Sequence, residues 1–215
     1  MSRIFDMDNP VMRALAVAAD LLALNLLTML CCVPVLTAGA ALAAMNDVLL
    51  HQVRGEEGYL LRSFFRSFAA NFKKATLLWL VVLAALVLVG ADYLAAGLTI
   101  PGLRVPVIAV GVLVIAWAMY VFALQSRYEN PPGRTMKNAA ALMVAYFPRT
   151  LGIVAFTGGF WLLAVKFWRI GAPLLLLFGL SLPCYVALLL LSGVFGKMEE
   201  KPSRADEDET EDNTP

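Results

Sequence analysis

The sequence contains few charged residues for its length. Only 15% of its 215 residues are Asp, Glu, Lys or Arg, whereas soluble domains carry about a quarter, and 60% are apolar. So few charged side chains cannot cover the surface of a soluble domain of this size. The composition therefore predicts that lipid covers most of the surface. It also excludes nucleic-acid binding, because the basic residues lie between apolar runs rather than along a wet face.

Residues that carry metal or nucleophile chemistry are also scarce. The chain has one histidine, His51, and its three cysteines, Cys31, Cys32 and Cys184, lie in apolar runs without CxxC spacing. The motifs GxSxG, HExxH, GxxxxGK[ST] and GxGxxG are absent. We therefore expect a protein that is not an enzyme and that holds no metal and no cofactor.

The long apolar runs predict an all-α fold, a polytopic membrane helix bundle. Backbone in hydrocarbon must satisfy its own hydrogen bonds, so each run should form a helix of about 20 residues. No removable signal peptide is expected at the N-terminus. Pro34 should separate the first two helices. Six spans are predicted, over residues 11–32, 35–53, 75–97, 105–124, 151–167 and 170–195. The alternative has five spans, with residues 35–53 on the membrane surface, because the polar residues Asn46, Asp47 and His51 make that segment less apolar than the others.

The distribution of Lys and Arg predicts the orientation, because short cytoplasmic loops are rich in them. With six spans and both termini inside, fourteen of the 17 basic residues lie on the inner side, and only Arg104, Lys166 and Arg169 lie outside. With five spans, Arg3 and Arg13 would face outward. We expect a multi-pass protein of the bacterial cytoplasmic membrane with both termini cytoplasmic.

The charge also divides the chain into two parts. Residues 199–215 hold eight acidic residues against Lys201 and Arg204, a net charge of −6, so residues 1–198 keep 15 basic and 8 acidic residues, a net charge of +7. The sequence therefore predicts an integral membrane domain over 1–198 and a disordered acidic tail over 199–215.

An amphipathic segment precedes the third predicted span. Residues 63–74 place four phenylalanines within about 100° of a helical wheel and basic residues opposite, typical of a helix at the inner membrane interface. The phenylalanines are Phe64, Phe65, Phe68 and Phe72, and the basic residues are Arg62, Arg66 and Lys73. Residues 134–149 resemble this pattern more loosely, which suggests a parallel repeat of 60–124 and 133–195. Chance similarity between apolar helices is the alternative.

A few polar residues lie within the predicted spans. An ionised Asp20 in the first span would cost several kcal/mol unless paired or hydrated, so it should face the protein interior. Together with Asn25 it would form a polar path for an ion or solute, or it would bond to Asn46, Asp47 or Arg13 and serve packing.

Near the inner end of the second predicted span, Asp47, His51 and Arg54 share a helical face. They predict a hydrated ion-pair cluster, with proton transfer as the alternative. The small residues of segment 37–45, with Gly39 and Ala43 four apart, should let another helix approach closely.

Several motifs resemble the YesL family of bacterial membrane proteins. They are FDMDNPVMR, DLLALNLLTMLCCVPVLTAGA and RGEEGYLLRSFFRSFAANFKKAT in the N-terminal part, and RYEN and MKNAA in the second half, so the resemblance covers about residues 4–198. The resemblance implies a biological process rather than a mechanism. The family is one of unknown function, and its members look like neighbours of carbohydrate ABC importers.

These features together favour a non-enzymatic membrane accessory protein associated with carbohydrate uptake by ABC importers, with the phenylalanine segment and the basic loops as contact surface. Its expected partners are membrane lipids, importer permease or ATPase subunits, or a second copy of the chain. The alternative is a small solute channel or secondary transporter that uses Asp20. A membrane sensor that feeds a signalling kinase is not separated from the first hypothesis by the sequence.

Overall fold

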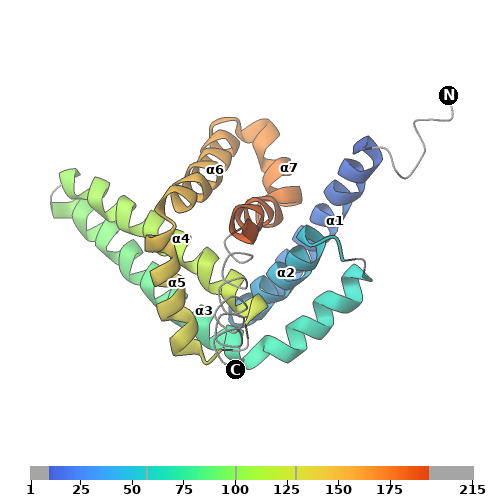
Figure 1. The fold of residues 1–215 in the computed structure, drawn as a ribbon. Coiled ribbons are helices and arrows are strands. Elements are labelled where there is room, and N and C mark those ends of the chain that lie inside the picture. Colours follow the sequence, from blue (N-terminus) through green and yellow to red (C-terminus); the bar gives the residue numbers. More distant parts are fainter. Residues whose placement is uncertain (1–9, 57, 100, 129, 194–215) are drawn as a thin grey trace, which may run out of the picture.

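The computed structural model describes residues 10–56, 58–99, 101–128 and 130–193, and these form helices without any strand (Figure 1). The all-α prediction is therefore confirmed for the described part of the chain. Its helices are α1 (Pro10–Cys31), α2 (Ala38–Val53), α3 (Leu60–Thr99), α4 (Arg104–Arg127), α5 (Pro132–Ala145), α6 (Phe147–Lys166), α7 (Trp168–Phe178) and a C-terminal helix (Ser181–Gly193). Two short 3-10 turns, η1 (Val35–Thr37) and η2 (Pro101–Leu103), precede α2 and α4.

Four of these helices are long and apolar enough to cross a membrane. The segments are Ala14–Cys31, Leu60–Ala96, Arg104–Arg127 and Phe147–Lys166. A fifth span results if Gly171–Phe178 and Ser181–Gly193, which meet at a 58° bend, count as one broken helix. The prediction of six spans is not confirmed, because α2 has only 16 residues.

Instead of lying on a surface, α2 is enclosed by its neighbours. Most of its residues, from Ala38 to Leu50, are buried, and the chain breaks before it at Pro34 as expected. A Cβ atom on Gly39 would overlap Trp79 and the backbone of Ala75 on α3. The absence of a side chain at this position therefore lets the two helices approach closely, which confirms the role predicted for the small residues of segment 37–45.

Helix α3 joins two predicted elements into one helix of 40 residues. Its polar half (residues 60–74) was expected as a separate interfacial helix, and its apolar half (residues 75–99) as a span. Figure 1 shows the two halves running in different directions, from the α2–α3 connection on the right to the α3–α4 junction on the left. From Leu60 to Trp79, α3 runs antiparallel to α2, since Trp79 Nε1 donates to the Val35 carbonyl at 2.8 Å while the end of α2 lies near Leu60 and Ser63.

The second predicted amphipathic segment is a separate helix, α5. Thr135, Ala139 and Leu142 form its buried side, at helical spacing, and Pro148 opens the next helix after a break at Tyr146. In both halves of the chain an amphipathic segment is followed by apolar helices: the polar half of α3 precedes its apolar half and α4, and α5 precedes α6 and α7. The proposed repeat of 60–124 and 133–195 nevertheless stays a prediction.

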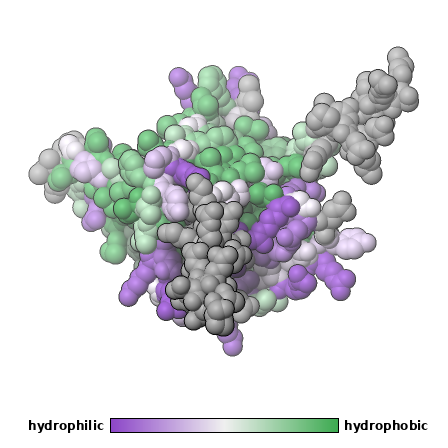
Figure 2. Space-filling model, in the orientation of Figure 1, coloured by the Kyte–Doolittle hydropathy of each residue, from purple (hydrophilic) through white to green (hydrophobic). Residues whose placement is uncertain are grey.

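Figure 2 shows where polar and apolar surfaces lie. Hydrophilic residues gather along the lower part of this view, with smaller groups at the upper tip and the left end, and hydrophobic surface covers most of the region between them. Large apolar side chains are exposed along the outer parts of α3, α4 and α6, for example Leu94, Val105 and Leu162 at about 70% of their area. These surfaces suit lipid, and the several long apolar helices are compatible with a membrane protein. The predicted acidic tail, 199–215, lies outside the described residues.

Candidate functional site: a polar cleft between α1, α2 and α3

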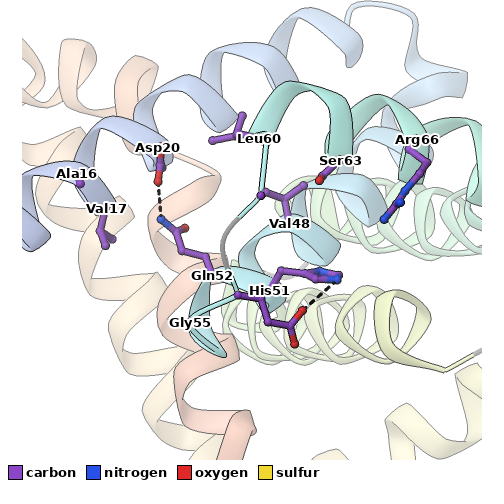
Figure 3. A pocket seen from close by; sticks show the side chains of 12 residues that line it. Ala16, Val17, Asp20, Val48, His51, Gln52, Gly55, Leu60, Ser63 and Arg66 are labelled. Carbon is purple, nitrogen blue, oxygen red and sulfur yellow. Dashed lines mark hydrogen bonds and ion pairs between the residues drawn. The ribbon is translucent and has the colours of Figure 1, made fainter.

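A cleft of about 520 Å³ opens between α1, the end of α2 and the start of α3 (Figure 3). Twelve residues line it, and half of them are polar or charged. The polar lining consists of Asp20, His51, Gln52, Glu56, Ser63 and Arg66, and the remainder is Ala16, Val17, Val48, Gly55, Gly58 and Leu60. Three of the polar or charged residues singled out in the sequence, Asp20, His51 and Arg66, therefore come together here.

The end of α2 explains how Glu56 reaches this cleft. Gly55 has a φ of +74°, a left-handed conformation that suits glycine. The Gly55 N–H donates to the Gln52 carbonyl and the Glu56 N–H to the His51 carbonyl, both at 3.0 Å. These two bonds form a Schellman motif, which closes the helix and turns the chain back over its last turn. As a result, the Glu56 carboxylate lies beside the His51 ring.

The ring of His51 has a defined orientation. Its Nδ1 donates to the Asp47 carbonyl at 2.7 Å, because a carbonyl oxygen can only accept. The Nε2 atom then faces Glu56 Oε2 at 3.6 Å (Figure 3). The Asp47 carboxylate lies 3.9 Å from Nδ1, and Arg54 lies 3.9 Å from Glu56 Oε1. The structure therefore brings His51 close to Asp47, and Glu56 close to both His51 and Arg54, while the predicted ion-pair character of this cluster and its proton-transfer alternative stay predictions.

Asp20 has a partner that the sequence did not suggest. Gln52 Nε2 donates to Asp20 Oδ2 at 3.0 Å, whereas Asn46 Nδ2 donates to the Leu42 carbonyl of its own helix. Gln52 lies one residue before the end of α2. Asp20 thus lies level with the α2–α3 connection, six residues or about 9 Å into the first candidate span. Its carboxylate faces a polar cleft rather than lipid.

Asn25, by contrast, lies away from the cleft and clamps the broken C-terminal helix pair. Its Oδ1 accepts from the N–H groups of Leu180 at 2.8 Å and Ser181 at 3.1 Å, and its Nδ2 donates to the Leu176 carbonyl at 2.8 Å. Helix ends leave such groups without intrahelical partners. The fully buried amide of Asn25 supplies those partners where α7 ends and the next helix begins.

The phenylalanine segment of α3 faces two ways. Phe64 is fully buried in the core and Phe68 is half-buried, so Phe64 is not available to a partner or to lipid. Phe65 and Phe72 remain exposed, at 52% and 38% of their area. They lie among exposed basic residues on the outer side of the polar half, rather than opposite those residues as the helical wheel predicted. We call this surface the aromatic-basic face, and it consists of Leu61, Arg62, Phe65, Arg66, Phe72 and Lys73.

A second, smaller hollow of about 350 Å³ adjoins the cleft. Tyr59, Arg62, Ser63 and Arg66 line it, so Ser63 and Arg66 belong to both. In the described part of the chain, no ion pair involves Arg62 or Arg66, and no three His, Cys, Asp or Glu side chains are grouped to hold a metal ion.

Sequence reasoning missed three polar residues of the cleft, Gln52, Glu56 and Ser63. Gln52 shares a helical face with Val48 and Gly55, and Glu56 follows a glycine after a helix, so a Schellman end was readable from the sequence. The contact of Gln52 with Asp20, 32 residues earlier, carried no local signal.

Comparison with known proteins yields one similarity. Residues 21–93, which run from α1 through α2 into the apolar half of α3, match the model of a family described as "Protein of unknown function, DUF624". No curated protein and no solved structure matches the chain. The matched segment includes most of the cleft and the whole aromatic-basic face.

Proposed function

We propose that this chain is a non-enzymatic integral membrane accessory protein that binds another membrane protein through its aromatic-basic face. The observation that carries the proposal is the exposure of Phe65 and Phe72 among Arg62, Arg66 and Lys73 on one side of α3. Aromatic residues and arginine are enriched at the centres of protein interfaces. The position of this face, at the polar end of a helix whose other half is apolar, suits a partner at the membrane surface.

The resemblance to the YesL family supports a more specific partner. On that basis we propose association with the permease or ATPase subunits of an ABC importer for carbohydrates, in the cytoplasmic membrane of a bacterium. The basic segments around α3 and α5 support a cytoplasmic location for this end of the molecule.

The experiment is quantitative mass spectrometry of what copurifies with the full chain from its own membranes after gentle solubilisation. Importer subunits should copurify with the native protein and be lost, by at least tenfold, from the double variant Phe65→Ser/Phe72→Ser. Val144→Ser on α5 is the control, because Val144 is an apolar residue on another amphipathic helix and is even more exposed than Phe65 and Phe72. Phe64 is left intact, since its loss would disturb the core.

Three results would overturn the proposal. Recovery of the chain alone, or unchanged recovery of the partner with the double variant, would remove the aromatic-basic face from partner binding. Loss of the double variant from the membrane fraction would show that this face anchors the protein to lipid instead.

A small solute channel or secondary transporter is the second candidate, and the polar cleft containing Asp20 favours it. Its test is a solute flux in proteoliposomes that Asp20→Asn abolishes. The engagement of Asn25 at the helix break weighs against a polar path that runs from Asp20 through Asn25.

A further inference from the structure

The cleft is lined by side chains of both charge signs, and two of these side chains have no oppositely charged partner. Asp20 is bonded only to the neutral amide of Gln52, and Arg66 has no ion pair within the described segments. A purely anionic ligand would meet the carboxylates of Asp20 and Glu56, and a purely cationic ligand would meet Arg66. A ligand that carries both charges fits the lining better than either.

Between His51 and Glu56 there is a place for a hydrogen-bond donor. Because Nδ1 of His51 carries a proton toward the Asp47 carbonyl, Nε2 is an acceptor whenever the ring carries a single proton. It faces another acceptor, Glu56 Oε2, at 3.6 Å. An ammonium nitrogen can lie about 2.8 Å from both atoms and donate to each. Arg54, at 3.9 Å from the other Glu56 oxygen, leaves Oε2 available.

An anionic group has a complementary place at Arg66. This residue lines both the cleft and the adjoining hollow, where Arg62, Tyr59 and Ser63 supply further donors. A guanidinium matches the geometry of a phosphate through parallel hydrogen bonds. Figure 3 shows Arg66 and the His51 ring on the same side of the cleft, with Asp20 and Gln52 on the other.

Apolar surface borders the same opening. Ala16, Val17, Val48 and Leu60 line part of the cleft. A ligand with acyl chains can therefore place its headgroup in the cleft and its chains along α1.

We infer that this cleft binds a phosphoethanolamine group, and that its source is the headgroup of phosphatidylethanolamine. The ammonium bridges His51 Nε2 and Glu56 Oε2, and the phosphate contacts Arg66. This inference shares Arg66 with the aromatic-basic face but not the exposed phenylalanines, so Glu56→Gln tests the cleft and Phe65→Ser/Phe72→Ser tests partner binding separately.

The test measures lipid binding to the delipidated full chain in detergent by native mass spectrometry. Phosphatidylethanolamine is compared with phosphatidylcholine of identical chains, whose quaternary ammonium cannot donate hydrogen bonds. We expect at least tenfold tighter binding of phosphatidylethanolamine. Glu56→Gln and Arg66→Gln should each reduce this binding about tenfold, while Arg134→Gln, an exposed arginine on α5, should not change it.

A second arm identifies the source of the group. Soluble glycerophosphoethanolamine should bind far more weakly than the lipid if the acyl chains contribute, and equal affinity would assign the site to a free solute with the same headgroup chemistry. The inference is overturned if the two lipids bind equally, if Glu56→Gln binds phosphatidylethanolamine like the native chain, or if neither the lipid nor the soluble headgroup binds.

Discussion

Single side chains at this protein's polar positions have distinct tasks that their positions in the sequence do not reveal. Asp20 and His51 face a cleft, whereas Asn25 supplies hydrogen bonds to a helix break more than 150 residues away. In lipid, a backbone group without a partner costs several kcal/mol, so a break inside an apolar region needs such a residue. The broken helix is therefore stable only together with α1.

Replacement of Asn25 by alanine tests this dependence. Leu176, Leu180 and Ser181 would lose their partners, and we expect the free energy of unfolding to fall by about 2–3 kcal/mol. Hydrogen exchange followed by mass spectrometry should show faster exchange in residues 176–184, while Asn138→Ala, at an exposed position on α5, should leave it unchanged. Equal protection of the break in both variants would contradict the clamp.

The packing of α2 against α3 depends on small side chains in one helix and large side chains in the other. The small residues of α2 permit a close approach to α3, and the large residues of α3 decide which side of that helix faces inward. Phe64 fills the core beside α2, while Phe65, the next residue, points outward. One helix therefore serves both the core and the aromatic-basic face.

The contact of α2 with α3 leads to a prediction about Gly39. In Gly39→Ala the new Cβ would overlap Trp79 and the Ala75 backbone, so the helices must separate, and we expect a loss of about 1–3 kcal/mol of stability. Thermal unfolding of the purified protein in detergent measures this loss. The matched control is Gly90→Ala in α3, where a Cβ meets nothing within 4 Å. A melting temperature for Gly39→Ala equal to that of the control would show that the helices are not in close contact.

At the scale of the whole molecule, the arrangement of α2 decides the membrane topology. Helix α2 lies alongside the polar half of α3, and it also runs antiparallel to α1, because Gln52 near its end contacts Asp20 near the start of the first candidate span. If α1 crosses the membrane, the two ends of α2 should therefore lie toward opposite sides, as six spans with two cytoplasmic termini require. Five spans with the N-terminus outside would need both ends of α2 on one side.

Cysteine labelling distinguishes the two topologies. In a background without the native cysteines, Leu36→Cys before α2 and Gly58→Cys after it should react with an impermeant maleimide from opposite sides. Arg104→Cys, beyond the apolar half of α3, should react from the same side as Leu36→Cys. Reaction of Leu36→Cys and Gly58→Cys from one side, opposite to Arg104→Cys, would instead show that α2 does not cross and would leave five spans.

The amino-acid sequence alone determines that this chain is helical, that lipid suits most of its surface, that it breaks at Pro34 and that small residues near Gly39 pack closely. These properties follow from local composition and periodicity, which act over a few turns of helix. Only the tertiary structure decides that Gln52 meets Asp20, that Asn25 holds the break near Ser181 and that Phe64 turns inward while Phe65 turns outward. Those outcomes depend on which helices become neighbours. The periodicity of residues along one helix does not identify the helix against which it will pack.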